Sequence, residues 1–246
     1  MGATRDRRLA WEGLLNARDL GGYPTADGYE TRWGSVVRSD NLTALTQAGQ
    51  AALVAYGVRS IIDLRRPHEV DEFPNPFAVR DTHAISYTNI PFQDPAAPED
   101  VESETLAFVY KAMLDQYSKR VAAVMTAIAD APDGGVLVHC MGGKDRTGLV
   151  SAFLLSLVGV APETIAADYA LSDEYLRPRE EAYLLNGPGE RAERERIVAK
   201  YSAKAETMLE TLEHLRERHG GVEGYLRNAG VSTDGIAALR RRLVPD

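Results

Sequence analysis

Residues 135–148 read Gly-Val-Leu-Val-His-Cys-Met-Gly-Gly-Lys-Asp-Arg-Thr-Gly, and this stretch decides the fold. Residues 136–138 form a short apolar, β-branched run that is typical of a buried strand. Gly142-Gly143 permits a tight turn, and residues 147–158 form an apolar stretch long enough for a buried helix. The order of strand, glycine-bearing loop and helix predicts an α/β fold, with the loop at the carboxyl end of a strand.

The loop between this strand and this helix can bind an anion and attack it. Backbone N–H groups converge where a loop enters a helix N-terminus, and the helix dipole adds partial positive charge, so a tetrahedral oxyanion can bind there. Arg146 can add a bidentate fork to two phosphate oxygens. The same field favours thiolate over thiol, so Cys140 is expected to be nucleophilic near neutral pH. A thiolate below a phosphate attacks phosphorus, which predicts phosphomonoester hydrolysis through a phosphocysteine intermediate.

A simpler interpretation is an inert, buried thiol. A lone cysteine is usually a small hydrophobic residue, and a cysteine and an arginine at this spacing often occur together by chance. The combination of further features makes chance a poor explanation. Within the strand-to-helix context these features are His139, the pair Gly142-Gly143, Lys144, Asp145, Thr147 and Gly148.

Residues 139–148 resemble the signature of the cysteine-dependent protein tyrosine phosphatase superfamily. The Gly-Lys-Asp-Arg-Thr ending is similar to the atypical bacterial tyrosine/dual-specificity branch, which includes secreted mycobacterial phosphatases that also act on phosphoinositides. The resemblance covers nearly the whole chain. Its other motifs are Asn-Ala-Arg-Asp-Leu-Gly-Gly at 16–22, Arg-Ser-Asp at 38–40, Asp-Leu-Arg at 63–65, Gly-Tyr-Leu at 224–226, Gly-Val at 230–231 and Leu-Arg at 239–240.

The expected architecture is one phosphatase domain over residues 1–246, with a central, mostly parallel sheet, flanking helices and a helical C-terminal part. Residues 66–105, rich in proline and acid, are expected to form loops over the active-site face around one strand. Strands are expected at 35–39, 58–64 and 84–91. Helices are expected at 48–56, 106–131, 147–158, 162–171 and 197–219, followed by two short ones.

In the expected two-step transfer, Cys140 attacks the phosphoryl group while Arg146 and the loop amides hold the equatorial oxygens. The Thr147 hydroxyl can hydrogen-bond to the thiolate. His139 is expected to set the shape of the loop through its own hydrogen bonds. The remaining loop residues that bind phosphate are Met141, Gly142, Gly143 and Lys144.

The leaving oxygen needs a proton, and a positioned acid typically accelerates this step by about 10² to 10⁴-fold. The Trp-Pro-Asp tripeptide that carries the acid in well-known eukaryotic tyrosine phosphatases does not occur in the sequence. The resemblance places an acid in the loop, so Asp145 is the first candidate and Asp63 the second. Asp145 could instead only stabilise the helix N-terminus. Glu69 is a more remote candidate neighbour of the site.

Two features of the sequence allow two interpretations each, and a third has one. Arg18 and Asp19 are either a surface ion pair or, given the resemblance, support for the phosphate loop. Lys144 adds a second cation at the mouth of the loop, which suits substrates with extra phosphates such as phosphoinositides. Residues 172–197, charged and interrupted, form either a helical lid over the site or a solvated linker.

Composition excludes several classes of protein. The net charge of −8 over 246 residues argues against nucleic acid or an anionic membrane as the main partner. A single cysteine excludes an intramolecular disulfide and a cysteine-rich zinc site, and no metal or other cofactor is expected. The longest apolar stretch, 149–161, is too short for a membrane anchor. No secretory signal is visible, so the expected location is the cytoplasm, with secretion by a signal-less route left open.

Two other kinds of protein could use a similar loop. A rhodanese-like sulfurtransferase also carries a loop cysteine, but its persulfide chemistry does not require an arginine at this spacing. A catalytically silent phosphate-binding module would not need both Cys140 and Arg146. The sequence therefore favours a phosphatase that acts on phosphotyrosine proteins. Two alternatives stay open: dual specificity, in which other phosphorylated residues are also accepted, and phosphoinositides as the substrate.

Overall fold

The computed structural model describes residues 5–78, 85–94 and 105–245. Its strands form one sheet in the order β1-β2-β5-β3-β4. β1 (Arg18–Asp19) is antiparallel to its neighbour, and the other pairings are parallel. The parallel strands are β2 (Val36–Ser39), β5 (Gly135–His139), β3 (Val58–Asp63) and β4 (Ser86–Asn89). This confirms the predicted α/β class with a mostly parallel sheet.

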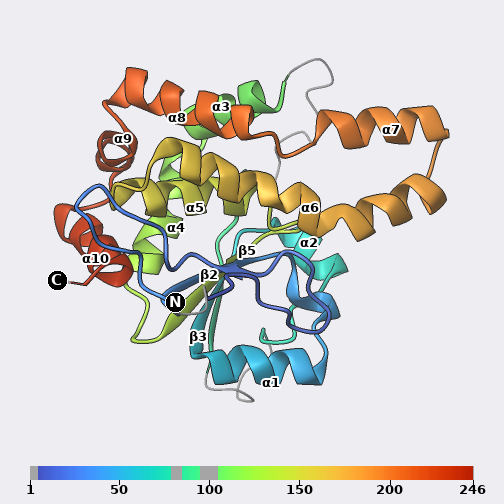
Figure 1. Cartoon of the computed structure of the whole chain (residues 1–246), viewed down its shortest axis with the longest axis horizontal. Helices are drawn as coiled ribbons and strands as arrows, with labels where there is room; N and C mark the ends of the chain where they lie inside the picture. The colour runs from blue at the N-terminus through green and yellow to red at the C-terminus, as the bar shows by residue number, and fades with distance from the viewer. Residues whose placement is uncertain (1–4, 79–84, 95–104, 246) are drawn as a thin grey trace.

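The two faces of the sheet pack into two separate cores, because successive side chains of a strand point to opposite faces. In β5, Val136 and Val138 enter the larger core, whereas Leu137 enters the smaller one. Figure 1 shows α1 (Gln47–Tyr56) on one side of the sheet and most other helices on the opposite side. The sheet is thus buried on both faces, as parallel sheets generally are.

The layer on the larger core contains most of the helical C-terminal part (Figure 1). Its helix closest to the sheet, α5 (Asp145–Leu157), is buried on every side from Thr147 to Leu155, which explains why its sequence is apolar all round. The other helices are α3 (Leu106–Gln116), α4 (Ser118–Ala129), α6 (Pro162–Asn186), α8 (Ala205–His219), α9 (Val222–Ala229) and α10 (Thr233–Leu243). The two short helices that the sequence predicted at the end of the chain are α9 and α10.

Two helices expected to be continuous are interrupted. The one expected over 106–131 is divided at Tyr117, whose φ of −110° and ψ of 24° leave the helical region and redirect the chain between α3 and α4. The one expected over 197–219 is divided into α7 (Arg191–Lys200) and α8. Between them the Asp173 carboxylate accepts hydrogen bonds from the Ser202 hydroxyl and the Ala203 N–H, which removes that N–H from a helical ladder.

Three other boundaries differ from expectation. The helix expected to end near residue 171 continues to Asn186 and contains Pro178. It is supported there by packing against α7 and α8, so tertiary contacts override the local cost of proline. A short 3-10 helix, η1 (Leu42–Ala44), precedes α1. Within residues 66–105, expected to be loops around one strand, α2 (Pro67–Glu72) forms with proline in its first turn. Much of the expected loop region, 79–84 and 95–104, lies outside the described residues.

None of the helices in the described ranges combines the length and apolar character that crossing a bilayer requires.

Candidate active site

The phosphate loop, residues 140–146, joins the carboxyl end of β5 to the N-terminus of α5. In the sheet His139 is paired with Ser39 of β2 on one side and with Asp63 of β3 on the other. The carboxyl ends of three parallel strands therefore meet at the loop, as is typical of ligand sites in open α/β sheets.

Three successive carbonyl groups of the loop are bonded from outside. The bonds run from Asn41 N to Met141 O (3.0 Å), from Asn16 Nδ2 to Gly142 O (2.9 Å) and from Arg38 Nη2 to Gly143 O (2.7 Å). Because C=O and N–H point in opposite directions in a peptide group, these bonds turn the N–H groups of residues 142–144 the other way. No described residue accepts a hydrogen bond from these N–H groups, which are thus available to an anion.

Gly143 is at the tightest point of the loop. Its φ of +64° lies in the left-handed region, and a Cβ there would come 2.3 Å from Ser39 O and 2.5 Å from Asp40 N. Gly142 has ordinary space, since the nearest atom to an added Cβ would be Leu176 Cδ1 at 3.7 Å. Only the second glycine of the pair is therefore required by the packing of the loop on the end of β2.

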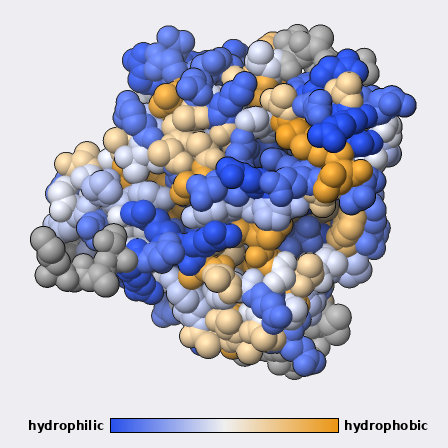
Figure 2. Space-filling model, turned by 45° about the vertical axis from the view of Figure 1, so that its right-hand side comes forward, coloured by the Kyte–Doolittle hydropathy of each residue, from blue (hydrophilic) through white to orange (hydrophobic). Residues whose placement is uncertain are grey.

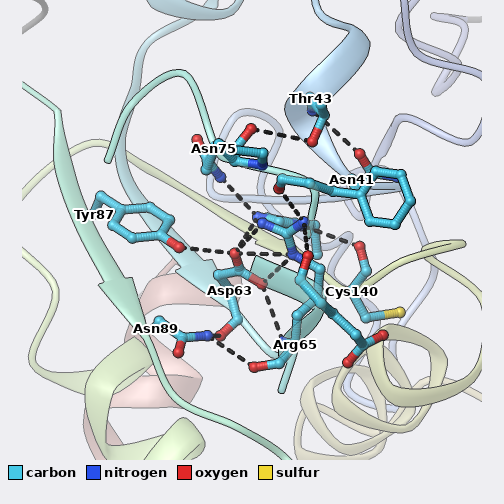
Figure 3. A network of polar contacts seen from close by, with 12 residues as sticks. Asn41, Thr43, Asp63, Arg65, Asn75, Tyr87, Asn89 and Cys140 are labelled. Carbon is cyan, nitrogen blue, oxygen red and sulfur yellow. Dashed lines mark hydrogen bonds and ion pairs between the residues drawn. The ribbon is translucent and has the colours of Figure 1, made fainter. Parts of the chain in front are cut away.

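Cys140 is the first residue of the loop, and its side chain is buried, with 1% of the residue exposed. Figure 3 shows its sulfur directed away from the Asp63 and Arg65 side chains. The Arg146 guanidinium interacts electrostatically with Cys140. The Thr147 Oγ1, at the start of α5, is buried and has no hydrogen-bond partner among the described residues. The predicted hydroxyl-to-thiolate hydrogen bond remains a prediction that this unpartnered hydroxyl supports.

Arg146 forms a bidentate ion pair with Glu69 of α2, at 2.6 and 2.7 Å. The Glu69 carboxylate is also held by the Arg66 N–H at 2.7 Å. Burial raises the pKa of Glu69, but the Arg146 guanidinium outweighs this and holds the pKa below its ordinary value. Burial lowers the pKa of Arg146, and Glu69 and the nearby Cys140 more than offset it. Glu69 thus orients the guanidinium, a closer role than the sequence indicated.

A second network lies behind the loop, at the end of β3 (Figure 3). His139 Nδ1 lies 3.1 Å from Cys140 O, and its Nε2 lies 3.1 Å from Asn75 Nδ2. Burial lowers the pKa of His139, which favours the neutral ring. Since an amide Nδ2 can only donate, we assign Nε2 as the acceptor and Nδ1–H as the donor to Cys140 O. His139 therefore contacts the backbone of the loop, as predicted for a residue that shapes it.

Asp63 is placed for structural support rather than for proton transfer. Its carboxylate is fully buried and accepts bonds from Arg65 Nε and Nη2 and from the Tyr87 hydroxyl (Figure 3). Burial raises the pKa of Asp63, but the charge of the Arg65 guanidinium and the hydrogen bonds that Arg65 donates outweigh it, so the pKa is lowered. An ionised, enclosed carboxylate has no proton to give, and the second candidate for the general acid is wrong.

Asp145, the first residue of α5, is held by Tyr110, whose hydroxyl is also bonded to Tyr169. The Tyr110 hydroxyl donates to Asp145 Oδ1 at 2.5 Å and lies 2.8 Å from the Tyr169 hydroxyl. Burial and the nearby Asp145 raise the pKa of Tyr110 well above its usual range, so it stays a neutral donor. Asp145 itself is half-buried. It is thus oriented by a side chain and remains partly accessible, which a mere helix-end carboxylate would not require.

Lys144 is less accessible than the sequence indicated. It is 8% exposed, and its Nζ donates to the carbonyl of Tyr201, just past the end of α7. A cleft of about 320 Å³ lies beside it, between the loop and the helices α6 and α7. Its lining includes Gly142, Lys144, Asp145, Leu176, Arg179 and Tyr201.

The residues of the 16–22 motif have separate roles. Arg18 is fully buried and binds Asp168 of α6 at 2.8 Å, so it is not part of a surface ion pair. The Asp19 carboxylate accepts bonds from Gly21 N, Gly34 N and the Tyr56 hydroxyl. Asp19 therefore secures the N-terminal segment and not the phosphate loop, and its predicted support of the loop is wrong.

Sequence reasoning missed the residues that hold the loop from outside. Asn16 lies in the motif at 16–22 and Arg38 in the motif at 38–40, and Asn41 follows directly after the second of these. A polar residue inside an otherwise apolar strand, such as Arg38 in β2, is the available signal, because buried charges are rarely unpaired. Asp168 and Tyr110 lie on helices and give no such signal.

No group of three or more His, Cys, Asp or Glu side chains in the described residues is arranged to hold a metal ion.

A cysteine and an arginine beside amides that no described residue bonds, at the turn from a buried strand into a helix, form the arrangement expected of an oxyanion-binding loop. Comparison with known proteins gives the family. The sequence matches the tyrosine phosphatase family over residues 9–245, and the chain belongs to this family as a protein-tyrosine phosphatase, which confirms the predicted class.

Two similar proteins illustrate the relationship. A tyrosine-protein phosphatase of Nostoc commune is 34% identical over 215 residues, which cover 84% of this chain and 73% of the relative. The triple specificity protein phosphatase PtpB of Mycobacterium tuberculosis is 28% identical over 284 aligned positions, which cover 97% of this chain and 98% of the relative. The similarity to bacterial phosphatases extends along nearly the whole chain, as the dispersed motifs indicated.

Replacement of the second glycine should damage the loop far more than replacement of the first. Gly143→Ala adds a Cβ that meets backbone atoms at a positive φ, so it should lower the free energy of unfolding by about 1–3 kcal/mol and weaken inorganic phosphate binding. Gly142→Ala, the matched control, should keep a melting temperature near that of the wild type. Thermal unfolding and phosphate titration measure both variants. Equal destabilisation by the two substitutions would contradict this account of the loop.

The Glu69–Arg146 pair should make stability depend on acid. Because the pKa of Glu69 is lowered from its ordinary 4.5, its contribution is present above that pH and is lost as the pH falls through the folded-state value. Glu69→Gln should therefore lower the free energy of unfolding by about 2 kcal/mol near neutral pH, with a smaller difference from the wild type in acid. Urea unfolding near neutral pH and in acid measures the difference in the free energy of unfolding between the variant and the wild type. Glu72→Gln, at an exposed position of the same helix, is the control. A pH-independent difference would count against the pair.

Proposed function

We propose that this chain hydrolyses phosphotyrosine in proteins by a cysteine-dependent mechanism, with all 246 residues forming one phosphatase domain. The observation that carries the proposal is the set of amides at 142–144, turned inward beside Cys140 and Arg146. Amides and a guanidinium in fixed positions stabilise the charge of a trigonal-bipyramidal phosphoryl group without reorganisation. The thiolate attacks phosphorus, the bond to the ester oxygen breaks, and water then releases phosphate from the sulfur.

In this mechanism Asp145 protonates the leaving oxygen in the first step and takes a proton from water in the second. Its half-buried position at the mouth of the loop and its bond from Tyr110 support the role. Thr147 stabilises the thiolate when it departs from phosphorus. Glu69 keeps the Arg146 guanidinium oriented until the guanidinium also binds a phosphate.

The lid interpretation of residues 172–197 is the one that the packing supports. The outer half of α6 and α7 form a hairpin beside the cleft (Figure 1), and Arg179 lies 3.5 Å from Met141 O. Figure 2 turns this side of the molecule toward the viewer and shows apolar patches among hydrophilic surface. Leu185 and Ile197 of the hairpin are 70% and 37% exposed. Because Cys140 is almost fully enclosed, we infer that this hairpin shifts when a substrate enters.

Substrate range beyond phosphotyrosine is a second part of the proposal. Lys144 and Arg179 are two cations at the cleft beside the loop, which would suit a ligand with additional phosphates. The relative from M. tuberculosis is named a triple specificity phosphatase. We infer that this chain also accepts phosphoserine or phosphothreonine peptides and phosphoinositides, with phosphotyrosine as the principal substrate.

A panel of substrates tests the activity and its range. Phosphotyrosine peptide, phosphoserine peptide and phosphoinositide vesicles are compared for wild type, Cys140→Ser and Lys144→Ala by release of phosphate. Cys140→Ser should retain phosphopeptide binding and lose hydrolysis, and Lys144→Ala should lose kcat/KM mainly on the phosphoinositide. Hydrolysis that survives in Cys140→Ser would refute the mechanism. An unchanged ranking in Lys144→Ala would refute the role of that lysine, and turnover of thiosulfate would favour a sulfurtransferase.

The general acid is tested with leaving groups of different basicity. Asp145→Asn should lower kcat by about 10²-fold or more on phenyl phosphate, whose leaving group needs a proton, and much less on an activated aryl ester. Tyr110→Phe keeps the carboxylate and loses only its orienting bond, so its loss should be smaller. Steady-state kinetics on both esters measure this. Equal losses on the two esters would exclude Asp145 as the acid.

A further inference from the structure

Behind the phosphate loop lies a buried ionic cluster of Arg18, Arg38 and Asp168. The Asp168 carboxylate accepts from Arg18 Nε at 2.8 Å and from Arg38 Nη1 at 2.6 Å. The side chains are no more than 1% exposed. These residues come from β1, β2 and α6, so the cluster joins the edge of the sheet to the helix that leads into the hairpin.

The cluster carries more positive than negative charge. Two guanidinium groups and one carboxylate leave an excess of one positive charge. Burial raises the pKa of Asp168, but Arg18 and Arg38 outweigh it and hold the pKa far below its ordinary value, so the carboxylate is ionised. Burial and the neighbouring Arg18 lower the pKa of Arg38, but a guanidinium stays protonated in proteins. The other side chains that contact the cluster are neutral, namely Tyr23, Ser172, Asn16 and Tyr175.

A buried excess charge has a large desolvation cost unless a nearby opposite charge compensates it. The phosphate loop is the nearest place where an anion is expected, because Arg38 Nη2 donates to Gly143 O at 2.7 Å. One guanidinium thus does two things at once. It fixes the direction of a loop peptide, and it brings positive charge to the back of the anion site.

We propose that Arg18, Arg38 and Asp168 form an electrostatic positioning unit, whose net positive charge strengthens oxyanion binding and favours the Cys140 thiolate. The inference rests on the proposed function, since it gives these residues a role at the same site. None of them touches the substrate, and each acts through the loop. Asp168 limits the effect, because its carboxylate neutralises one of the two guanidinium groups.

Other charged groups face the loop from every element packed against it, and the substitutions below leave them in place. His139 is neutral, and Arg65 neutralises Asp63. The remaining groups are Glu69 of α2, Asp40 after β2, Asp145 and Arg146 of α5, Arg179 of α6 and Lys144 of the loop itself.

Two substitutions with opposite changes of charge test the proposal. Arg38→Gln makes the cluster neutral and Asp168→Asn makes it doubly positive, whereas Tyr23→Phe removes one hydroxyl from the same carboxylate without a change of charge. Two quantities are measured on the intact protein: the affinity for inorganic phosphate and the midpoint pH of iodoacetamide alkylation of Cys140. Far-UV circular dichroism and thermal unfolding check that each variant is folded.

Arg38→Gln should weaken phosphate binding about tenfold and raise the alkylation midpoint by about one pH unit. Asp168→Asn should change both in the opposite direction, and Tyr23→Phe should change neither appreciably. A change in the same direction for Arg38→Gln and Asp168→Asn would mean that the cluster only supports the fold, and it would overturn the proposal. The proposal would also be overturned if Arg38→Gln kept the phosphate affinity and the alkylation midpoint of the wild type.

A further variant decides the matter where Asp168→Asn does not fold. Arg38→Lys keeps the positive charge and loses the planar fork, so its phosphate affinity should lie closer to that of the wild type than Arg38→Gln does. Equal losses in the two Arg38 variants would overturn the electrostatic role. Hydrolysis is measured in parallel with Cys140→Ser, and its outcome bears on the proposed function only, because phosphate affinity needs no turnover.

Discussion

The site depends on one constraint, which is that the carbonyl groups of residues 141–143 are bonded from outside the loop. Asn41, Asn16 and Arg38 supply the donors. A loop of this length could turn its peptide groups in many ways, and fixing them costs conformational entropy. The external bonds meet that cost during folding rather than during binding. In the proposed mechanism the amides are therefore already directed at the phosphate when the substrate arrives, which is the condition for electrostatic stabilisation of a transition state.

The same arrangement explains why so much charge is buried near the loop. A thiolate enclosed at 1% exposure would be unfavourable in an apolar interior. Here Arg146 lies beside it and is kept in place by Glu69, and the cluster around Arg38 lies behind the loop. Networks of this kind are seldom the most stable way to fill a core. They are understandable as the means of keeping positive charge fixed around one anion.

The central part of the fold could be predicted from the sequence because local patterns determine it. The β5–loop–α5 unit follows from apolar runs and a glycine pair, and the family follows from the motif at residues 139–148, which contains Cys140 and Arg146. The breaks at Tyr117 and at 201–204 could not be foreseen, since they depend on contacts such as that of Asp173 with Ala203. Asp63 shows the same limit. Its position at a strand end was correct, but its partners Arg65 and Tyr87 exclude it as an acid.

The cysteine-dependent mechanism is tested most directly by rapid acid quenching of the protein during turnover of a phosphotyrosine peptide, followed by mass spectrometry of the peptide that contains Cys140. A phosphoryl adduct on Cys140 should form within the first turnover and disappear when substrate is exhausted. The Cys140→Ser protein, quenched in the same way, should show no adduct and release no phosphate. If the wild type turned over substrate and phosphate were never found on this sulfur, the phosphocysteine intermediate would be refuted.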